Sequence, residues 1–498
     1  MYTLGIDIGT TNIKSVLFKP GAILVAQAVR EYKTSFLHPS WAQQNADDWW
    51  NTVVETIRKV LADSGVDSAE IAAVAISCQA PTMLPVDKTG KPLSDALIWM
   101  DRRSDAQCER LSEKIGAQRI FDISGNRMDP FYVLGKLLWF KENQPDLYER
   151  TFKVLSPNSY VNLKLTGEYS LDPVHASLSQ AYDIRSNRWS DEILAAAGIS
   201  SSLFPPVTEG HVPIGTVSSS AAESTGLKAG TPVLTGTVDG AAAALEAGVV
   251  GSGTAVEMTG TSSVLLMSSA SPMTSMNLTY MYSAAPGHHL LLGAMSSTGA
   301  ALKWFRDTLY EAQSPDAYAH MDEEISKKAT HPTNIVFLPY LAGERAPIWD
   351  SDARGTFLGL TLSTDRSQVV RSIMEGSAFA LRDNVDEAAR AGIQLDRIRT
   401  VGGHANSDVW LKIKASVLDR EIDVVDASLG APGGLAYLLG AYTGEFSSIE
   451  EASVACLHIK RSVGPVREWV GQYRELFGLY KSIYGHLKDD FVALAKIK

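Results

Sequence analysis

Two short turns rich in glycine and hydroxyl side chains could bind the oxygens of a polyphosphate. The first is Asp7-Ile8-Gly9-Thr10-Thr11, in which a strand-end aspartate precedes glycine and two threonines. Backbone N–H groups and hydroxyls in such a turn can hold phosphate oxygens, while the acid reaches a phosphate-bound Mg²⁺. The second, Gly260-Thr261-Ser262, has the same character without the acid. For each turn taken alone, a hairpin with purely local hydrogen bonds is the structural alternative.

A third candidate is the aspartate in Thr235-Gly236-Thr237-Val238-Asp239-Gly240, between a strand-like segment and an alanine-rich helix. Phosphoryl transfer needs a carboxylate that orients and deprotonates the attacking hydroxyl. Asp239 is therefore the candidate catalytic base. Its structural alternative is a simple helix N-cap.

Paired glycines form a fourth candidate. Gly402 and Gly403 follow a predicted strand over 398–401, and Asn406 lies between them and a predicted helix ending near Leu418. Glycines at a helix start let a flat ring or a phosphate approach the backbone closely. A helix entry without any ligand is the alternative.

These residues need elements that bring their turns together, and the hydrophobic pattern predicts a repeated α/β order. The first half has predicted strands over 4–8, 13–18, 22–28 and 71–76, with a helix from an Asn45 cap to Ser64-Gly65. The second half has predicted strands over 254–259, 264–267, 289–292 and 334–338, with a helix over 300–310. Together with the repeated turn, this order predicts a duplicated α/β unit, divided into residues 1–247 and 248–498.

Three further stretches have a distinct character. Residues 156–191 mix polar, glycine and aromatic residues, which predicts a lid or a sugar-side insertion, and residues 205–230 read as a connecting loop. The tail from residue 467 is predicted to be helical, with four apolar residues on one face: Tyr473, Leu476, Leu479 and Tyr480.

Composition narrows the class of protein. The chain has 498 residues, too many for one compact core, and a net charge of −11. This acidity argues against nucleic-acid and membrane partners, which need basic surfaces. Three separated cysteines, no recognisable signal peptide and no bilayer-length apolar run make the cytoplasm the expected location.

The motifs together resemble the FGGY family of carbohydrate kinases. The two turns and the glycine pair look like the phosphate and adenosine loops of sugar kinases on the actin-like (ribonuclease H-like) fold. The segments 337–347 and 355–376, the latter ending in Met374-Glu375-Gly376, resemble the family's signature in its C-terminal domain. The resemblance extends from residue 3 to about 485. Within the family, the segments 41–44, 98–103 and 135–139 look most like xylulokinases.

The resemblance implies two actin-like α/β domains with a cleft between them. ATP would lie on residues 248–498, held by Asp7, Gly9, Thr10 and Thr11, by Gly260, Thr261 and Ser262, and by Gly402, Gly403 and Asn406. Mg²⁺ would lie near Asp7 and Asp239. The sugar or polyol would lie on residues 1–247, at Gln79, Ala80, Pro81, Trp99, Asp101 and Asp239. The oligomeric state is left open, with a homodimer as one alternative.

Two departures from the xylulokinase pattern affect this expectation. Where xylulokinases usually carry Gln-Met-His-Gly, this chain has Gln79-Ala80-Pro81-Thr82, so the histidine that would meet a sugar hydroxyl is absent. This predicts a substrate other than D-xylulose. The second departure, Val133 three residues before Lys136 in place of Pro, Ser or Thr, is expected to affect packing only.

Other readings stay open at this point. The substrate could be ribulose, gluconate, a tetritol, glycerol or a signalling carbohydrate. A non-catalytic actin-like ATPase, such as a chaperone or filament protein, would explain both turns but not Asp239 or the sugar-side segments. A regulator that binds sugar without turnover is a third reading, against which the presence of both Asp7 and Asp239 counts.

Overall fold

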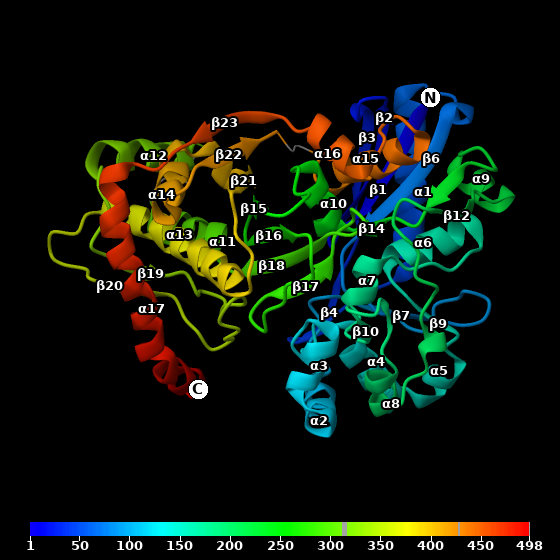
Figure 1. Ribbon diagram of the computed structural model, residues 1–498, viewed down its shortest axis with the longest axis horizontal. Coiled ribbons are helices and arrows are strands. Elements are labelled where there is room, and N and C mark those ends of the chain that lie inside the picture. The colour runs from blue at the N-terminus through cyan, green and yellow to red at the C-terminus, as the bar shows by residue number, and fades with distance from the viewer. Residues whose placement is uncertain (311–315, 427–428, 498) are drawn as a thin grey trace.

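The computed structural model describes residues 1–310, 316–426 and 429–497, and the chain forms two α/β halves that lie side by side (Figure 1). Each half is built on one large twisted sheet with helices on its faces. This arrangement confirms the fold predicted from the sequence, a pair of duplicated actin-like domains.

The first half contains a seven-stranded sheet in the order β12-β13-β6-β1-β2-β3, with β14 also paired to β6. Its strands are β1 (Tyr2–Ile8), β2 (Asn12–Lys19), β3 (Ile23–Glu31), β6 (Ile71–Cys78), β12 (Pro213–Thr216), β13 (Pro232–Leu234) and β14 (Thr237–Val238). β1, β2 and β3 form an antiparallel meander, whereas β6 runs parallel to β1.

Smaller sheets and helices complete this half. The remaining strands are β4 (Ser35–His38), β5 (Trp41–Gln44), β7 (Leu84–Val86), β8 (Ala96–Leu97), β9 (Lys153–Leu155), β10 (Tyr182–Asp183) and β11 (Arg188–Trp189). The helices are α1 (Ala46–Ser64), α2 (Asp105–Ile115), α3 (Ala117–Ser124), α4 (Val133–Asn143), α5 (Pro145–Arg150), α6 (Pro157–Thr166), α7 (Pro173–Ser177), α8 (Asp191–Ala197), α9 (Ser219–Thr225) and α10 (Asp239–Glu246).

The second half repeats the plan with the strand order β17-β18-β16-β15-β21-β22-β23. These strands are β15 (Thr254–Thr259), β16 (Ser263–Ser269), β17 (Thr279–Tyr282), β18 (His289–Met295), β21 (Arg397–Gly402), β22 (Ile422–Val425) and β23 (Ile459–Val463). β15, β16 and β18 form the antiparallel meander, and β21 runs parallel to β15 as β6 does to β1. The duplication of the unit therefore extends to strand direction.

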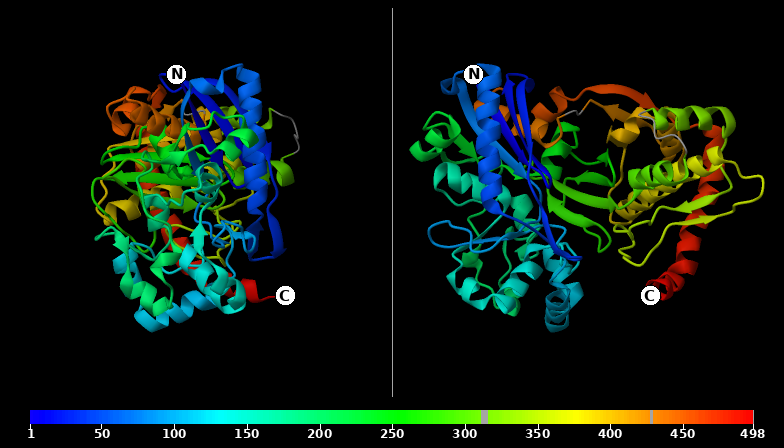
Figure 2. Two further views of the ribbon diagram at one scale, coloured as in Figure 1. Left: turned by 90° about the vertical axis from the view of Figure 1, so that its right-hand side faces the viewer. Right: turned by 180° about the vertical axis from the view of Figure 1, so that it is seen from behind.

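The helices of the second half lie mostly at the outer side of its sheet (Figures 1 and 2). They are α11 (Thr298–Leu309), α12 (Ala317–Lys328), α13 (Arg366–Arg390), α14 (Asp408–Leu418), α15 (Ala431–Thr443), α16 (Ile449–Ala455) and α17 (Arg467–Lys496). A separate two-stranded sheet joins β19 (Val336–Leu338) to β20 (Thr356–Leu358).

The first sheet is covered by helices from both halves of the chain. On one face, Trp49, Val53 and Ile57 of α1 pack among the alternate buried residues of β1. On the other face lies α15, which packs against β1, β6 and α10 although it follows residue 430. α10 and α15 meet so closely that a Cβ on Gly434 would overlap the carbonyl oxygen of Ala242. One buried hydrophobic cluster therefore spans both halves.

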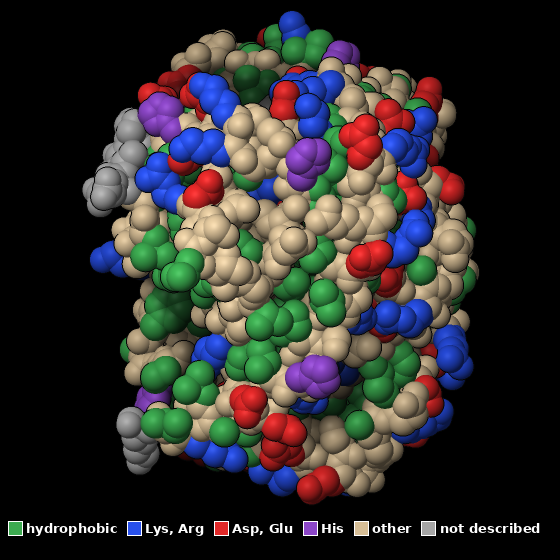
Figure 3. All heavy atoms as spheres, turned by 90° about the vertical axis from the view of Figure 1, so that its left-hand side faces the viewer, with side chains coloured by type: hydrophobic (Ala, Val, Ile, Leu, Met, Phe, Trp, Pro, Cys, Tyr) green, Lys and Arg blue, Asp and Glu red, His purple; other side chains and the backbone are tan. Residues whose placement is uncertain are grey.

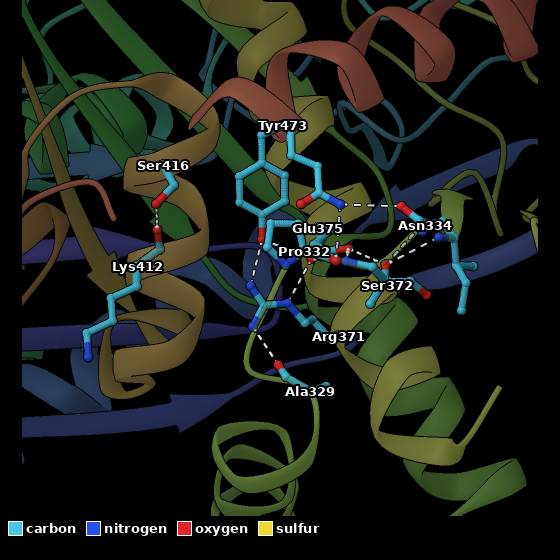
Figure 4. A network of polar contacts seen from close by, with 12 residues as sticks. Ala329, Pro332, Asn334, Arg371, Ser372, Glu375, Lys412, Ser416 and Tyr473 are labelled. Carbon is cyan, nitrogen blue, oxygen red and sulfur yellow. Dashed lines mark hydrogen bonds and ion pairs between the residues drawn. The ribbon is translucent and has the colours of Figure 1, made fainter. Parts of the chain in front are cut away.

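A buried polar network fastens α13 to α17 and to the segment before β19 (Figure 4). The side chain of Arg371 is 1% exposed, and its Nε donates to Glu375 Oε1 at 2.9 Å. Its Nη1 donates to the carbonyl of Ala329 at 2.8 Å, and its Nη2 to the hydroxyl of Tyr473 at 2.9 Å. Glu375 also accepts from the Thr333 hydroxyl at 2.5 Å. Glu375, part of the signature at 374–376, thus has a structural role.

Most of the predicted elements are present in the structure, with the following differences. The strand over 334–338 forms as β19 but pairs only with β20, and β21 takes the central position. The segments 156–191 and 205–230, predicted as loops, contain α6, α7, β12 and α9. β17 was missed. Leu479, predicted on one face of the helix with Tyr473, Leu476 and Tyr480, is 55% exposed, whereas those three residues are buried.

The surface carries charges of both signs in mixture. Figure 3 shows the face of the second half, where Lys and Arg side chains lie among Asp and Glu side chains rather than in one stripe. Across the described residues, no helix is both long and apolar enough to cross a membrane.

Candidate active site

The carboxyl ends of three neighbouring strands bring the two predicted acids together. β1 and β14 both run parallel to β6 and flank it, so that Asp7 and Thr237 are each paired with Ser77. Ser77 Oγ donates a hydrogen bond to Asp7 Oδ1 at 2.7 Å. Asp239 follows two residues after Thr237, as the first residue of α10. The sheet therefore places both carboxyl groups at one edge, on either side of the same strand.

Burial disfavours the charged forms of both acids, and the charge of Asp7 adds to this effect at Asp239. Burial raises the pKa of Asp7 to about 6, while the Ser77 hydroxyl and the Lys14 ammonium act in the opposite direction. Burial, and then the negative charge of Asp7, raise the pKa of Asp239 to about 7. A divalent cation between the two carboxylates would relieve this repulsion.

The two acids fit Mg²⁺ better than a cation held by protein ligands alone. Within the described part of the chain, no group of three or more His, Cys, Asp or Glu side chains is arranged to hold a metal. Mg²⁺ commonly binds one or two carboxylates together with water and substrate phosphates. Asp7 and Asp239 match that pattern.

The turn at residues 7–11, called the first phosphate turn after its predicted role, contacts a residue that is predicted to bind the sugar. Gly9 N–H donates to Asn12 O at 3.0 Å, which closes the turn between β1 and β2. Trp99 Nε1 donates to Thr10 Oγ1 at 3.0 Å, and Gln44 Nε2 donates to Thr10 O at 2.9 Å. Trp99, one of the predicted sugar residues, thus contacts the turn. Thr11 remains exposed at its tip.

The second phosphate turn lies between β15 and β16. Gly260 N–H donates to Ser262 O at 2.9 Å, and the backbone N–H of Ala300 in α11 donates to Thr261 O at 2.8 Å. Gly299 packs so closely on this turn that a Cβ there would overlap Gly260 O. The turn is therefore fixed to the start of α11.

The glycine pair after β21 lies beside this second turn, and its members differ. Gly402 has φ +96°, and a Cβ there would overlap the carbonyl of Thr259, so it is required by the backbone. A Cβ on Gly403 would meet no protein atom within 4 Å. Gly403 instead lines a cavity of about 470 Å³, together with Gly260, Thr261 and Asn406. A second cavity, of about 410 Å³, reaches from Thr259, Gly260 and Gly402 to Glu246, Leu429 and Gly430.

We expect Gly403→Val to raise KM for ATP about tenfold and to leave sugar binding nearly unchanged. A Cβ at Gly403 meets no protein atom within 4 Å, so we expect the fold to tolerate the valine while the ligand loses space in the cavity. Steady-state kinetics with varied ATP and calorimetry with the sugar measure the two effects. Loss of sugar binding with ATP binding retained would mean that the two ligands occupy the opposite halves.

The predicted sugar residues do not all face an open space. Gln79 is buried, and its Nε2 donates to Gln44 Oε1 at 2.6 Å and to Tyr32 OH at 3.3 Å. Ala80 is half-buried and Pro81 is buried. Neither of these two side chains carries a polar atom.

Asp101, predicted to bind the sugar, lies in a buried ion pair. Its side chain is 0% exposed, accepts from Ala42 N at 2.7 Å and forms an ion pair with Arg103 at 2.7 Å. The Arg103 guanidinium lies against the rings of both Trp41 and Trp139, 3.9 and 4.8 Å from their centroids. The three xylulokinase-like segments thus meet in one structural cluster. In this conformation Asp101 has no surface for a sugar, because the cluster encloses it.

A buried network next to Asp239 was not anticipated. Asp172 contacts His175 Nδ1 and accepts from Thr237 Oγ1 at 3.1 Å, and His175 Nε2 lies 3.3 Å from Cys78 Sγ. This network supports the ends of β6 and β14, which are followed directly by Gln79 and Asp239. No spacing pattern connects residue 172 with residues 78 and 237, so the sequence offered no signal for it.

Comparison with known proteins is consistent over the whole chain. Residues 2–246 match the N-terminal domain, and residues 255–443 the C-terminal domain, of the FGGY family of carbohydrate kinases. The chain is 29% identical to a xylulose kinase of Bacillus subtilis, covering 91% of this chain and 90% of that protein. It is 30% identical to a glycerol kinase of Shewanella amazonensis, covering 90% and 92%. The crystal structure of a xylulose kinase from Rhodospirillum rubrum superposes with TM-score 0.93 at 27% identity, covering 99% and 100% of the two chains.

Proposed function

Because this chain belongs to the FGGY family of carbohydrate kinases, we propose that Asp239 is the general base with which it phosphorylates a sugar or polyol hydroxyl from ATP. The observation that carries this assignment is the pairing of β1 and β14 with β6, which sets Asp7 and Asp239 on either side of Ser77. A pKa of about 7 for Asp239 is close to the value at which a general base is most effective near neutral pH.

The protein's part in the reaction is to position groups and move one proton. Asp239 accepts the proton of the substrate hydroxyl as the oxygen attacks the γ-phosphorus, and the bond from that phosphorus to the ADP oxygen breaks. Both phosphate turns supply N–H and hydroxyl donors to the phosphoryl oxygens. Thr10 and Thr261 lie in equivalent turns of the two halves, which supports a shared role of the two turns in holding the phosphoryl oxygens.

Mg²⁺ is part of this proposal, and Asp7 and Asp239 would hold it. Bound to phosphoryl oxygens, the ion would neutralise charge that develops during transfer. Burial raises the pKa of both acids, and the charge of Asp7 raises that of Asp239 further, which supports a cation at this position.

The nucleotide is proposed to occupy the second half. Gly260, Thr261, Gly403 and Asn406 all line the cavity of about 470 Å³, a volume suited to a small-molecule ligand. Ser262 belongs to the same turn, and Gly402 shapes it through its backbone rather than by contact. In the first half, Asp7, Gly9, Thr10 and Thr11 would complete the phosphate contacts.

We further propose that the preferred substrate is not D-xylulose. Proline lacks a backbone N–H and alanine a polar side chain, so Ala80 and Pro81 offer few donors to a sugar hydroxyl. Nε2 of Gln79 and the carboxylate of Asp101 are engaged within the protein, so that Gln79 has only its Oε1, an acceptor, without a partner among the described residues. Fewer directional contacts favour another ketose, a polyol or a sugar acid, because discrimination between hydroxyl patterns depends on such contacts.

A substrate panel tests this expectation. ADP formation would be measured with D-xylulose, D-ribulose, D-gluconate, erythritol and glycerol. We expect at least one other compound to exceed D-xylulose about tenfold or more in kcat/KM. The Asp239→Asn protein, purified identically, serves as the control for contaminating kinases. D-xylulose as the best substrate, at about 10⁴ M⁻¹s⁻¹ or above, would decide against the proposal.

The remaining parts of the proposal concern the setting of the enzyme. A cytoplasmic location is part of the proposal, and the use of ATP and the three unpaired cysteines support it. The small-molecule substrate is the partner the site requires. A homodimer is the oligomeric state to be tested, by light scattering.

A further inference from the structure

A buried ion pair joins the elements that lead into the nucleotide turns. Lys414 of α14 is buried, and its Nζ donates to both carboxylate oxygens of Glu257, each at 2.7 Å. Glu257 belongs to β15, which ends at the second phosphate turn. Thr400 Oγ1, from β21, donates to Glu257 Oε2 at 3.3 Å. The pair thus connects the second phosphate turn, the glycine turn and the helix that follows.

Lys414 also determines which nitrogen of His404 carries a proton. Its Nζ lies 3.2 Å from His404 Nδ1. An ammonium has donors only, so Nδ1 must be the acceptor. Burial, and then the charge of Lys414, lower the pKa of His404 well below its usual value, so that the ring is neutral. Burial lowers the pKa of Lys414 as well, but the Glu257 carboxylate opposes that change. The remaining proton of His404 therefore lies on Nε2.

The Nε2–H of His404 is buried without a hydrogen-bond partner in the described residues. The residue is 5% exposed, and its ring stacks on Trp410 with centroids 3.7 Å apart. Its backbone N–H donates to Thr259 Oγ1 at 3.1 Å, which holds it against the second phosphate turn. An unpaired buried donor lowers the stability of the folded protein. A ligand that supplies an acceptor to this N–H would remove that cost when it binds.

The surroundings of Nε2 indicate that partner. A Cβ on Gly299 would lie 3.0 Å from Nε2, which places the nitrogen at the start of α11. His404 and Gly299 both line the cavity of about 470 Å³, with Gly260 and Thr261. The orphan donor therefore belongs to the wall in which the nucleotide is proposed to bind.

We propose that His404 is a nucleotide-binding residue whose Nε2–H donates a hydrogen bond to an oxygen of the bound nucleotide, and that Lys414 is its positioning residue. The inference rests on the nucleotide site proposed above. The acceptor is either a ribose or a phosphoryl oxygen, because both accept from a neutral N–H. Lys414 secures this arrangement by keeping the proton away from Nδ1.

Calorimetry with ADP and with adenosine tests the contact. We expect His404→Ala to weaken ADP binding about tenfold, the effect of one hydrogen bond in a buried site, with sugar binding unchanged. An equal loss with adenosine assigns the acceptor to the ribose, and a loss with ADP alone assigns it to a phosphoryl oxygen. Kd values within twofold of the wild type for both ligands would overturn the inference. Failure of the wild-type protein to bind ADP would instead remove the proposed nucleotide site.

Two lysines on the same helix provide a matched pair for the positioning role. Lys412 of α14 is exposed, and its backbone carbonyl accepts from Ser416 in the view of Figure 4. We expect Lys412→Met to bind ADP like the wild type and Lys414→Met to bind it more weakly. Equal ADP affinity of the two folded variants would contradict a role for Lys414.

A spectroscopic measurement covers the case in which Lys414→Met does not fold. In ¹⁵N-labelled wild-type protein, nuclear magnetic resonance reports the tautomer of each histidine ring, and His404→Gln assigns the signal. We expect the Nε2–H form, with its proton resonance displaced on addition of ADP. A proton on Nδ1, or a resonance that ADP leaves unchanged, would overturn the inference.

Discussion

Asp239→Asn is expected to lower kcat by roughly 10²-fold or more, the scale associated with loss of general-base catalysis. Asparagine has nearly the same shape and can still accept from Gly240 N–H, as Asp239 Oδ1 does at 2.6 Å. It cannot take the proton of the attacking hydroxyl. Binding of ATP should change little, because both phosphate turns remain. Turnover would be measured from the amount of ADP formed, and the affinity for nucleotide by calorimetry.

A stability measurement separates lost chemistry from lost folding. The fold raises the pKa of the Asp239 carboxyl from 3.8 to about 7. The contribution of this carboxyl to the free energy of unfolding is therefore favourable below about pH 4 and is lost as the pH rises through 7. Without metal at pH 8, Asp239→Asn should therefore be no less stable than the wild type. Asp489→Asn, at an exposed position of α17, is the control for the substitution itself. Turnover near the wild-type value in a clean preparation of the Asp239 variant would rule out the assignment.

The second large effect concerns stability. Arg371→Met should reduce the free energy of unfolding by about 3–5 kcal/mol, the usual consequence of leaving one member of a buried ion pair alone. The substitution removes the cation from Glu375 and also the donors to Ala329 O and Tyr473 OH. The substitution also removes the contact between the guanidinium and the Trp469 ring, whose centroid lies 4.3 Å away. Urea denaturation measures the change.

The pH and a second variant identify the cause. Burial already raises the pKa of Glu375, and the Arg371 charge opposes this rise. Without Arg371 the pKa rises further, so the loss of stability should be larger at pH 8 than at pH 5. Arg371→Met combined with Glu375→Leu should recover part of the loss, because no charge is then left buried. The exposed pair Lys327–Glu323 gives the control, and Lys327→Met should cost less than about 1 kcal/mol. An Arg371→Met variant as stable as this control would refute the argument.

The sequence was most informative about the positions of candidate site residues in turns that directly follow a strand. The turn after β1, the turn after β15 and the aspartate at the start of α10 were all found, because apolar strands ending in glycine and hydroxyl residues have a clear local pattern. The order of strands and helices also revealed the duplication. The division at residues 247 and 248 and the roles of the individual site residues stay predictions until the experiments above are done.

The sequence could not predict which polar side chains are already paired with other groups of the protein. Asp101 reads as an available acid, yet Arg103, two residues later, encloses it with the help of two distant tryptophans. Gln79 is likewise engaged by Gln44. The contact between Lys414 and Glu257 joins residues 157 positions apart. Such pairings depend on how sheets and helices pack, which no local spacing encodes.

The position of α15 has a consequence for how such genes can be cut and recombined. α15 follows almost all of the second half, yet it covers the apolar face of β1 and β6 in the first. A gene truncated after codon 247 would encode a sheet with one bare hydrophobic face, a state that favours aggregation. A chimera that exchanges residues 1–247 with those of a relative must transfer residues 431–443 as well, because Gly434 packs on Ala242 of α10 without space for a side chain. The two halves are thus copies in architecture but not separable modules.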